Sequence, residues 1–332
     1  MQAFVVPLFA LALGAGPGAP AAAGDWVLAS GTGTCSVTSV DFPDGPRGFA
    51  AGAFNCGLLT MDGGYSWTPI DVVPEHGQSL VWAHAASADE LYAARLGFYR
   101  STDRGASWAQ VGPWDTSSPG SIFDVAFLAS GRLVAIKGGQ TWTSDDQGDH
   151  WTLRYPGEMD RNFHELHFPG SGAIGYATGG VVRGSMGNGI GTVLRTADAG
   201  ATWTVLDFPH GAITAADFVD SDHAMVAVQN HWTGRLYVTS DGAATWQALP
   251  SAPPGWITSL KQRSASHWYA ATADGCLQTS RNGGHSWQAD YCDADFRALA
   301  SINLRGGAAV AAGNDGLVLY EDRILRSGFE GP

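Results

Sequence analysis

The stretch TMDGGYSW at residues 60–67 decides the fold, because it returns five more times along the chain. The further copies are STDRGASW at 101–108, SDDQGDHW at 144–151, TADAGATW at 196–203, TSDGAATW at 239–246 and SRNGGHSW at 280–287. The shared pattern is Ser/Thr-x-Asp-x-Gly-x-Ser/Thr-Trp, and three copies depart from it at His150, Ala243 and Asn282. The spacing of the tryptophans stays in the low forties, except for one longer interval between Trp151 and Trp203. Such a period is typical of the blades of a β-propeller.

The pattern of each repeat predicts four short strands. In the first repeat we expect strands at 37–42, 48–53, 58–60 and 66–70, which puts the repeated stretch in the hairpin between strands three and four. Its carboxylate can accept hydrogen bonds from the turn, and its glycine can take a positive φ. The tryptophan then begins strand four and packs against a neighbouring sheet. The structural acids of these turns are Asp62, Asp103, Asp146, Asp198, Asp241 and, as an amide, Asn282.

The number of blades follows from the two ends of the repeat array. Six copies give six blades, and after Trp287 three more strands are expected at 297–303, 308–313 and 316–321. The missing fourth strand lies at the other end, because Trp26 precedes Trp67 by the same interval that separates Trp67 from Trp108. Closing the ring with this N-terminal strand leaves no open sheet edge. We therefore expect an all-β, seven-bladed propeller, with six or eight blades as the alternatives.

Composition excludes several classes of protein. Glycine makes up 45 of the 332 residues, about twice the usual share, and lysine occurs only at Lys137 and Lys261. Long helix formers are too scarce for a bundle, and 45% apolar residues are enough to bury a core. The net charge of −13 argues against binding nucleic acid or an anionic membrane, since both need a basic surface.

Residues 1–23 read as a signal peptide. An apolar run at 4–15 leads to the small residues 21–23, although the expected basic residue before the run is missing. The run is too short to span a membrane, and no later stretch is apolar enough. We expect cleavage near Ala23, a propeller over 24–325 and a short tail at 326–332. The mature protein is expected to be secreted or periplasmic.

The repeated stretch is an Asp-box, or BNR repeat, and the chain resembles the Asp-box β-propeller superfamily over residues 25–325. The hydrophobic strand ending in Phe, the Gly-rich strand and the box together resemble the photosystem II stability/assembly factor-like branch. That resemblance implies an exported seven-bladed protein. The box is specific for the fold and weak for function, because it also occurs in sialidases, xyloglucan hydrolases and sorting receptors.

Four cysteines agree with export. Cys56 and Cys276 each lie at the same distance before a box tryptophan, in the turn between strands two and three, while Cys35 and Cys292 lie in links between blades. These two kinds of loop share one face of a propeller. We expect disulfides Cys35–Cys56 and Cys276–Cys292. A zinc site is the alternative, but no CxxC spacing supports it.

The sequence contains no motif that strongly indicates catalysis. The sialidase Phe/Tyr-Arg-Ile-Pro motif is absent, and Arg100 and Arg195 occupy one repeat position, as structural arginines would. The carboxylate pairs Asp220/Asp222 and Asp293/Asp295 could serve glycoside hydrolysis, but we expect them to be solvated loop residues. His164 and His167 fall on opposite faces of a strand, which disfavours a metal site.

The loops between strands two and three and the links between blades form the candidate binding surface, called the loop face below. We expect its contacts to centre on Arg183, His231, Trp232 and Trp256, with Lys137, Arg161 and His76 nearby, and the extra residues of the fourth blade to lie there as well, at 179–191. The other polar or aromatic candidates there are Glu75, Trp114, Asp115, Glu158 and His210. Exposed aromatics among polar groups suit a binding surface, although Trp114 and Trp256 could instead pack between blades.

The sequence therefore favours a non-catalytic binding or assembly scaffold with a protein or peptide partner. The positive charge of Arg183 and Lys137 favours an acidic or C-terminal-carboxylate segment of that partner. The alternative is a glycan-active propeller, either a hydrolase of sialidase or xyloglucanase type or a lectin. We expect no cofactor, no metal, no nucleic acid, no membrane span and a monomer.

Overall fold

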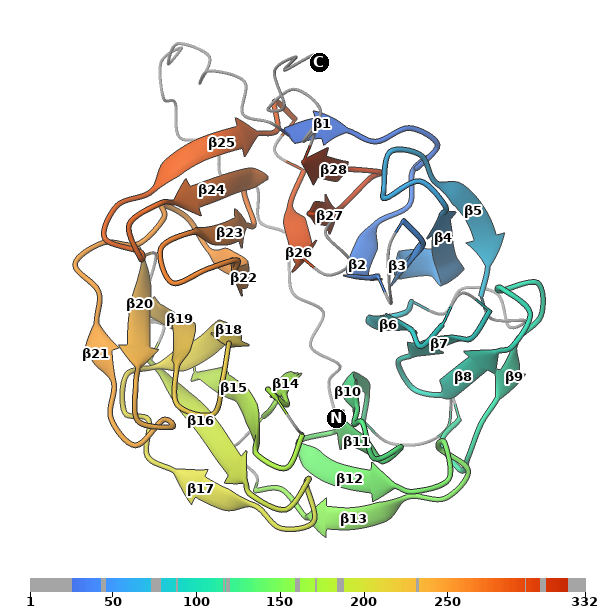
Figure 1. The fold of residues 1–332 in the computed structure, drawn as a ribbon, viewed down its shortest axis with the longest axis horizontal. Coiled ribbons are helices and arrows are strands. Elements are labelled where there is room, and N and C mark those ends of the chain that lie inside the picture. Colours follow the sequence, from blue (N-terminus) through green and yellow to red (C-terminus); the bar gives the residue numbers. More distant parts are fainter. Residues whose placement is uncertain are drawn as a thin grey trace, which may run out of the picture.

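The computed structural model describes residues 26–42, 46–72, 79–87, 89–115, 117, 120–158, 162–170, 172–183, 188–230, 233–295, 297–304 and 309–321. Those residues form seven four-stranded antiparallel sheets arranged as blades in a ring (Figure 1). This confirms the expected seven-bladed propeller. The expected signal peptide at 1–23 and tail at 326–332 lie outside the described residues.

Blades one to four follow one another along the chain, each running outward from the centre of the ring. Blade one is β2 (Val37–Asp41), β3 (Gly48–Gly52), β4 (Cys56–Thr60) and β5 (Thr68–Asp71). Blade two is β6 (Trp82–Ala85), β7 (Leu91–Ala94), β8 (Phe98–Ser101) and β9 (Ala109–Gln110). Blade three is β10 (Ile122–Phe127), β11 (Leu133–Lys137), β12 (Gln140–Ser144) and β13 (Thr152–Tyr155). Blade four is β14 (Glu165–His167), β15 (Gly175–Arg183), β16 (Asn188–Thr196) and β17 (Thr204–Leu206).

The remaining three blades complete the ring. Blade five is β18 (Ala212–Phe218), β19 (Ala224–Asn230), β20 (Thr233–Thr239) and β21 (Gln247–Ala248). Blade six is β22 (Ile257–Gln262), β23 (Trp268–Thr272), β24 (Cys276–Ser280) and β25 (Gln288–Cys292). Blade seven is β26 (Leu299–Asn303), β27 (Val310–Gly313) and β28 (Val318–Glu321), with β1 (Trp26–Leu28) as its outermost strand. In this blade Trp26 pairs with Glu321 and Leu28 with Leu319.

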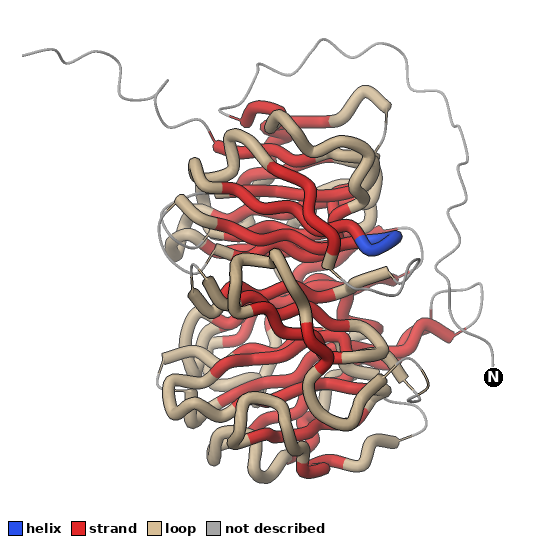
Figure 2. The backbone as a smooth tube through the Cα atoms, turned by 90° about the vertical axis from the view of Figure 1, so that its right-hand side faces the viewer, coloured by secondary structure: helices blue, strands red, loops and turns tan. Residues whose placement is uncertain are grey.

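The hydrophobic core lies between the blades. Seven clusters of buried side chains each combine residues of two neighbouring blades, so every interface in the ring has its own core. Trp26, for example, packs edge-on against Tyr269 of blade six at 5.8 Å between ring centroids. Burial of this apolar area is what holds blades together that share no sheet. Figure 2 shows the resulting stack of strands from the side.

The repeated turn has the geometry that its residues predict. Asp62 accepts the Ser66 backbone N–H at 2.9 Å and the Ser66 hydroxyl at 2.5 Å, and the Thr60 hydroxyl donates to it at 2.8 Å. The Gly64 N–H in turn donates to the Thr60 hydroxyl at 3.0 Å. Gly64 has φ +95°, and Ala243, which replaces glycine in the fifth copy, adopts φ +68°. In every copy the Ser/Thr hydroxyl and the Asp or Asn side chain accept backbone N–H groups of the turn. In contrast, four box tryptophans have a buried indole N–H with no hydrogen-bond partner among the described residues, namely Trp108, Trp151, Trp246 and Trp287.

Strand boundaries differ slightly from the expectation. The fourth strand of blade one begins at Thr68, so Trp67 lies just before the strand, where its indole N–H donates to the Gly64 carbonyl at 3.0 Å. Within the extra stretch at 179–191, residues 179–183 and 188–191 belong to β15 and β16. They lengthen β15 and β16 into nine-residue strands.

Both expected disulfides are present, Cys35–Cys56 and Cys276–Cys292. Cys292 is the last residue of β25 and pairs directly with Cys276 in the ladder, rather than lying in the link that follows. The only helix in the described part of the chain is the three-residue η1 (Ala53–Asn55), which is far too short to cross a bilayer.

Candidate functional site

The loop face carries three exposed aromatic side chains among the described residues. Trp256, in the link before β22, is 43% exposed, as expected for a binding residue. Phe123, near the loop-face end of β10, is 40% exposed, and Phe54, in the turn between β3 and β4, is 83% exposed. Neither phenylalanine was among the residues expected from sequence. This face therefore offers apolar contact area at separate blades.

Trp114 is a packing residue. It is buried, stacks on the box residue Trp151 at 4.4 Å and meets Trp142 edge-on at 5.7 Å. The alternative that Trp114 packs between blades is the one that the structure supports.

Lys137 is buried beneath the loop face, with only 5% of the residue exposed. Its ammonium donates to the Gly120 carbonyl at 2.5 Å and lies 5.6 Å from the ring centre of Trp114. Burial lowers the pKa of Lys137 to about 8, with the nearby Asp115 carboxylate acting in the other direction. Lys137 therefore holds the backbone at Gly120, just before β10, and offers little free charge to a partner.

The structure leaves several predicted residues without side-chain description. His76, Arg161, His231 and Trp232 lie outside the described residues, and Arg183 is described only as the backbone end of β15. Glu75 also lies outside them. Their predicted roles stay predictions.

The other described candidates have partners within the fold. His210 stacks on Tyr237 at 4.4 Å. Glu158 accepts the Tyr155 hydroxyl at 3.0 Å, and Asp115 accepts the backbone N–H and hydroxyl of Ser117.

A central cavity of about 510 Å³ was not expected from sequence. It is lined by the innermost strands of the blades, which surround the centre of the ring in Figure 1. Its charged and titratable lining residues are Asp41, His84, Asp124, His164, Glu165, Asp217 and Lys261.

Among the described residues, polar side chains of the inner strands connect six of the seven pairs of neighbouring blades, all except blades two and three. An inner strand is the edge of its own sheet, so some of its backbone N–H groups need partners elsewhere. Asp124 accepts the Leu166 N–H at 2.7 Å, Glu165 accepts the Ala216 N–H at 2.7 Å, and Asp217 accepts the Gln262 N–H at 2.8 Å. Equivalent bonds are Ala83 N–H to Ser39, Ala85 N–H to Asp41, Ile302 N–H to Ser259 and the Asn303 amide to the Val40 carbonyl.

Burial and charge interactions in the cavity shift several pKa values. Burial raises the pKa of Asp124 to about 6, although the hydrogen bond from Leu166 and the charge of His167 act in the other direction. Burial also acts to raise the pKa of Glu165, but His167, His164 and Lys261 outweigh it and the net shift is downward. Burial acts to lower the pKa of Lys261, yet Asp217, Glu165 and Asp124 raise it overall. Burial lowers the pKa of His164.

His164 and His167 have different surroundings, and His164 lines the central cavity. His167 faces Glu165, with Nε2 and Oε2 3.7 Å apart, and its ring packs on Phe218. Across the described part of the chain, no group of three or more His, Cys, Asp or Glu residues is placed to hold a metal ion.

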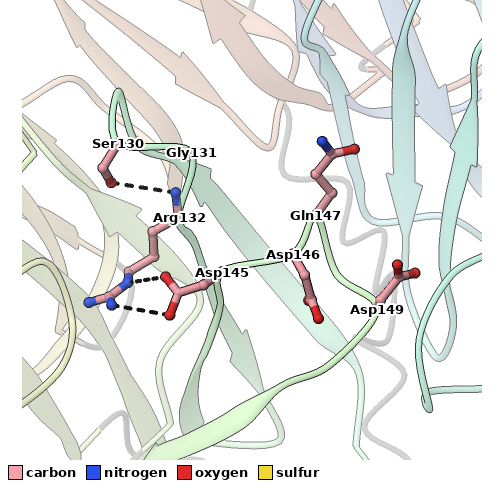
Figure 3. A pocket seen from close by; sticks show the side chains of 7 residues that line it. All are labelled: Ser130, Gly131, Arg132, Asp145, Asp146, Gln147 and Asp149. Atoms are coloured by element: carbon pink, nitrogen blue, oxygen red, sulfur yellow. Dashed lines mark hydrogen bonds and ion pairs between the residues drawn. The ribbon is translucent and has the colours of Figure 1, made fainter.

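A second hollow of about 500 Å³ lies on the opposite face, between the box turn of blade three and the turn from β10 to β11 (Figure 3). There Arg132 forms a paired contact with Asp145, with Nε to Oδ1 at 2.7 Å. The carboxylate of Asp146 is occupied by the His150 backbone and ring and by the Ser144 hydroxyl. The polar groups of this hollow therefore serve the turns that carry them.

One member of each carboxylate pair proposed from sequence has a structural role. Asp220 accepts the backbone N–H groups of Asp222 and His223, which makes it the organiser of a turn. Asp293 is not solvated: it is 5% exposed and binds the Arg297 guanidinium at 2.7 Å, which lowers its pKa to about 2. The repeat-position arginines are also structural, since Arg100 pairs with Glu90 and Arg195 donates to the Tyr176 hydroxyl.

Comparison with known proteins shows two kinds of relative. No protein-family model matches the chain. A sequence named "Probable oligoxyloglucan-reducing end-specific xyloglucanase", from Neosartorya fischeri, is 27% identical over 140 residues, which is 40% of this chain and only 17% of that protein's length.

Among solved structures, YCF48 bound to D1 peptide superposes with a TM-score of 0.69 at 19% identity, covering 90% of this chain and 96% of that one. The GH74 xyloglucanase from Xanthomonas campestris gives a TM-score of 0.64 at 15% identity, covering 92% of this chain and 54% of that one. At these identities the likeness is one of fold.

Proposed function

We propose that this protein is an exported, non-catalytic propeller that binds a protein or peptide segment on its loop face. The observation that carries the proposal is the exposure of Trp256 and Phe123 on that face, Phe123 at the rim of the central cavity. Aromatic side chains held on strands or tight links provide apolar contact at a low entropic cost. The predicted residues Arg183, His231, Trp232, Arg161 and His76 belong to the same proposed surface.

The structural comparisons support this reading. YCF48 bound to D1 peptide matches this chain along nearly its whole length, whereas the chain spans about half of the GH74 xyloglucanase. A single propeller of this size is thus known to accept a peptide. The two disulfides fit an oxidising compartment, as an exported protein would require.

A glycan hydrolase is the second candidate, and the cavity supplies an observation in its favour. Asp124 has a raised pKa and Glu165 a lowered one, the opposite shifts that an acid and a base of a glycosidase require. Each of these carboxylates already accepts a backbone N–H of the next blade, which accounts for its position without catalysis. We therefore prefer a binding function to a hydrolase.

Two measurements separate the candidates. Immobilised protein is used to select binders from a random library of dodecamer peptides, and the selected peptides are titrated against wild type and Trp256→Ala. We expect the Trp256→Ala variant to bind at least ten-fold more weakly, with Met61→Ser, an exposed apolar residue of the box turn, as the matched control. Hydrolysis of xyloglucan that disappears in Asp124→Asn would replace the binding assignment with a hydrolase.

A further inference from the structure

Phe54 is the most exposed large apolar side chain among the described residues, at 83%. It lies in η1, the three-residue turn that joins β3 to β4 on the loop face of blade one. A phenyl ring in this position gains almost no packing within its own chain. Its exposure therefore lowers solubility without adding to the stability of the fold.

The backbone at this turn is also unfavourable for Phe54. Phe54 has φ +56° and Asn55 has φ +61°, in the left-handed region that side chains with a Cβ rarely adopt. The turns between the second and third strands of blades three and six place glycines there, with φ +80° at Gly139 and φ +81° at Gly275. Blade one instead holds a bulky aromatic in a conformation that glycine would adopt without strain.

Several contacts fix the strained turn. The Ala53 N–H donates to the Ser36 carbonyl at 2.8 Å, and the Phe54 N–H lies 3.4 Å from the Ser79 hydroxyl. The next residues, Asn55 and Cys56, are anchored too, because Asn55 is buried and Cys56 is bonded to Cys35. The ring is thus presented by a rigid support, so that little conformational entropy is lost when a partner covers it.

The charges beside the turn are negative. Asp71, which pairs with Cys56 across the β4–β5 ladder, and Asp315, which is bonded to Ser36, are both exposed. The Arg297 guanidinium reaches the Asp315 carbonyl, but it is held by Asp293. With Lys137 buried and a net charge of −13, this part of the loop face suits a cationic partner rather than the acidic one expected from sequence.

We propose that Phe54 is the apolar anchor of a docking surface for an extended protein segment in which an apolar side chain is flanked by lysine or arginine. The apolar side chain covers the phenyl ring, and the basic side chains face Asp71 and Asp315. This inference rests on the proposed binding function. It adds the class of partner and a second apolar anchor, Phe54, in addition to Trp256.

The first test measures thermal stability, because a binding role and a structural role for Phe54 predict opposite changes in Tm. Replacing Phe54 by glycine removes strain and exposed apolar area, so Phe54→Gly is expected to raise Tm by about 2 °C. A lower Tm would show that the ring supports the fold and would overturn the proposal. Phe54→Tyr keeps the ring and serves as the matched variant.

The second test uses the random dodecamer library of the preceding experiment. We expect enriched peptides to carry an apolar residue flanked by lysine or arginine, to bind Phe54→Gly at least ten-fold more weakly, and to bind Phe54→Tyr nearly as well as wild type. Added salt should weaken binding to wild type, and Asp71→Asn with Asp315→Asn should reduce that salt dependence.

The outcomes separate this inference from the function on which it rests. Peptides that depend on Trp256 but bind Phe54→Gly as they bind wild type would overturn the role of Phe54 and leave the binding function standing. A library that yields no binders would overturn both. Phe54-dependent sedimentation with phosphatidylcholine vesicles would identify a lipid surface and also overturn the proposal.

Discussion

Asp124 of blade three accepts the backbone N–H of Leu166 in blade four at 2.7 Å, so that a titratable side chain forms one of the joints between blades. The pKa of this carboxyl is raised by burial to about 6, while an unfolded chain leaves an aspartate near 3.8. The folded state thus binds the proton more tightly than the unfolded state does. Any stability that this group contributes is complete below the unfolded pKa and is lost as pH rises through about 6.

Asp124→Asn is expected to remove the loss of stability that wild type shows as pH rises through about 6. The amide oxygen can still accept the Leu166 N–H, and the amide carries no charge at any pH in this range. The free energy of unfolding from urea titrations, compared between wild type and variant from pH 4 to pH 7, should show a difference that grows in favour of the variant as pH rises. A difference that is constant over this range would contradict the raised pKa.

The box aspartates should give the opposite pH dependence. The Ser66 hydroxyl and N–H and the Thr60 hydroxyl outweigh burial and lower the pKa of Asp62, and the pKa values of the other four box aspartates are lowered too. Their stabilisation is present above the unfolded pKa and is lost as pH falls through the folded values, so stability should decline between about pH 4 and pH 2.

Asp62→Ala is expected to cost about 1–3 kcal/mol, because the Ser66 and Thr60 donors lose their acceptor. Asp62→Asn should cost much less. The sixth copy already has an amide at this position. Asn282 accepts the backbone N–H of Ser286, the counterpart of Ser66, at 2.9 Å and donates to the Ser286 hydroxyl at 2.9 Å. Urea unfolding at pH 7 measures both values, and equal costs for the two variants would show that the amide is no substitute.

The outermost strand of blade seven should matter through Trp26. This side chain is buried against Tyr269 and the core between blades six and seven, so Trp26→Ala is expected to destabilise by about 3–5 kcal/mol. Leu28→Ala, on the same strand but half exposed, is the control and should cost far less. Thermal unfolding of the two variants checks the difference, and similar losses would argue against a packed β1.

The Cys276–Cys292 disulfide closes a segment with a sequence separation of 16 residues. On the chain-entropy account, the double variant Cys276→Ser/Cys292→Ser should lose roughly 3 kcal/mol. Denaturant unfolding without reductant is the appropriate measurement. Reductant also opens Cys35–Cys56, so it should destabilise wild type more than it destabilises the variant. Equal losses in the two proteins would contradict a stabilising Cys276–Cys292 bond.

The blade count and both disulfides could be predicted from sequence because they depend on local, repeated residues. Thr60, Asp62 and Trp67 have counterparts at fixed offsets in each copy, and Thr60 and Asp62 accept backbone N–H groups of the same turn. Cysteines placed at equivalent repeat positions then fall on a common face.

The central cavity was missed for a physical reason. Asp124 of β10 and Glu165 of β14 lie one repeat period apart, so a periodic signal exists, but a polar residue on an edge strand reads equally well as solvated. Only the ring geometry places each of them against the backbone of the next blade. Phe54 was missed because a positive φ at a phenylalanine contradicts local preference and is imposed by the surrounding contacts.

The pairing of β1 with β28 has a consequence for biosynthesis. A ribosome delivers β1 first, and this strand has no partner until β28 has been made, after all the other strands of the ring. During that interval the nascent chain carries a lone apolar strand at one end and an unfinished sheet edge at the other, both open to mispairing. The β1–β28 pair joins the first and last strands of the ring and so has the largest sequence separation of its strand pairs, which makes its loop-closure cost the highest. A holdase chaperone that shields the first strand should therefore raise the yield of native protein.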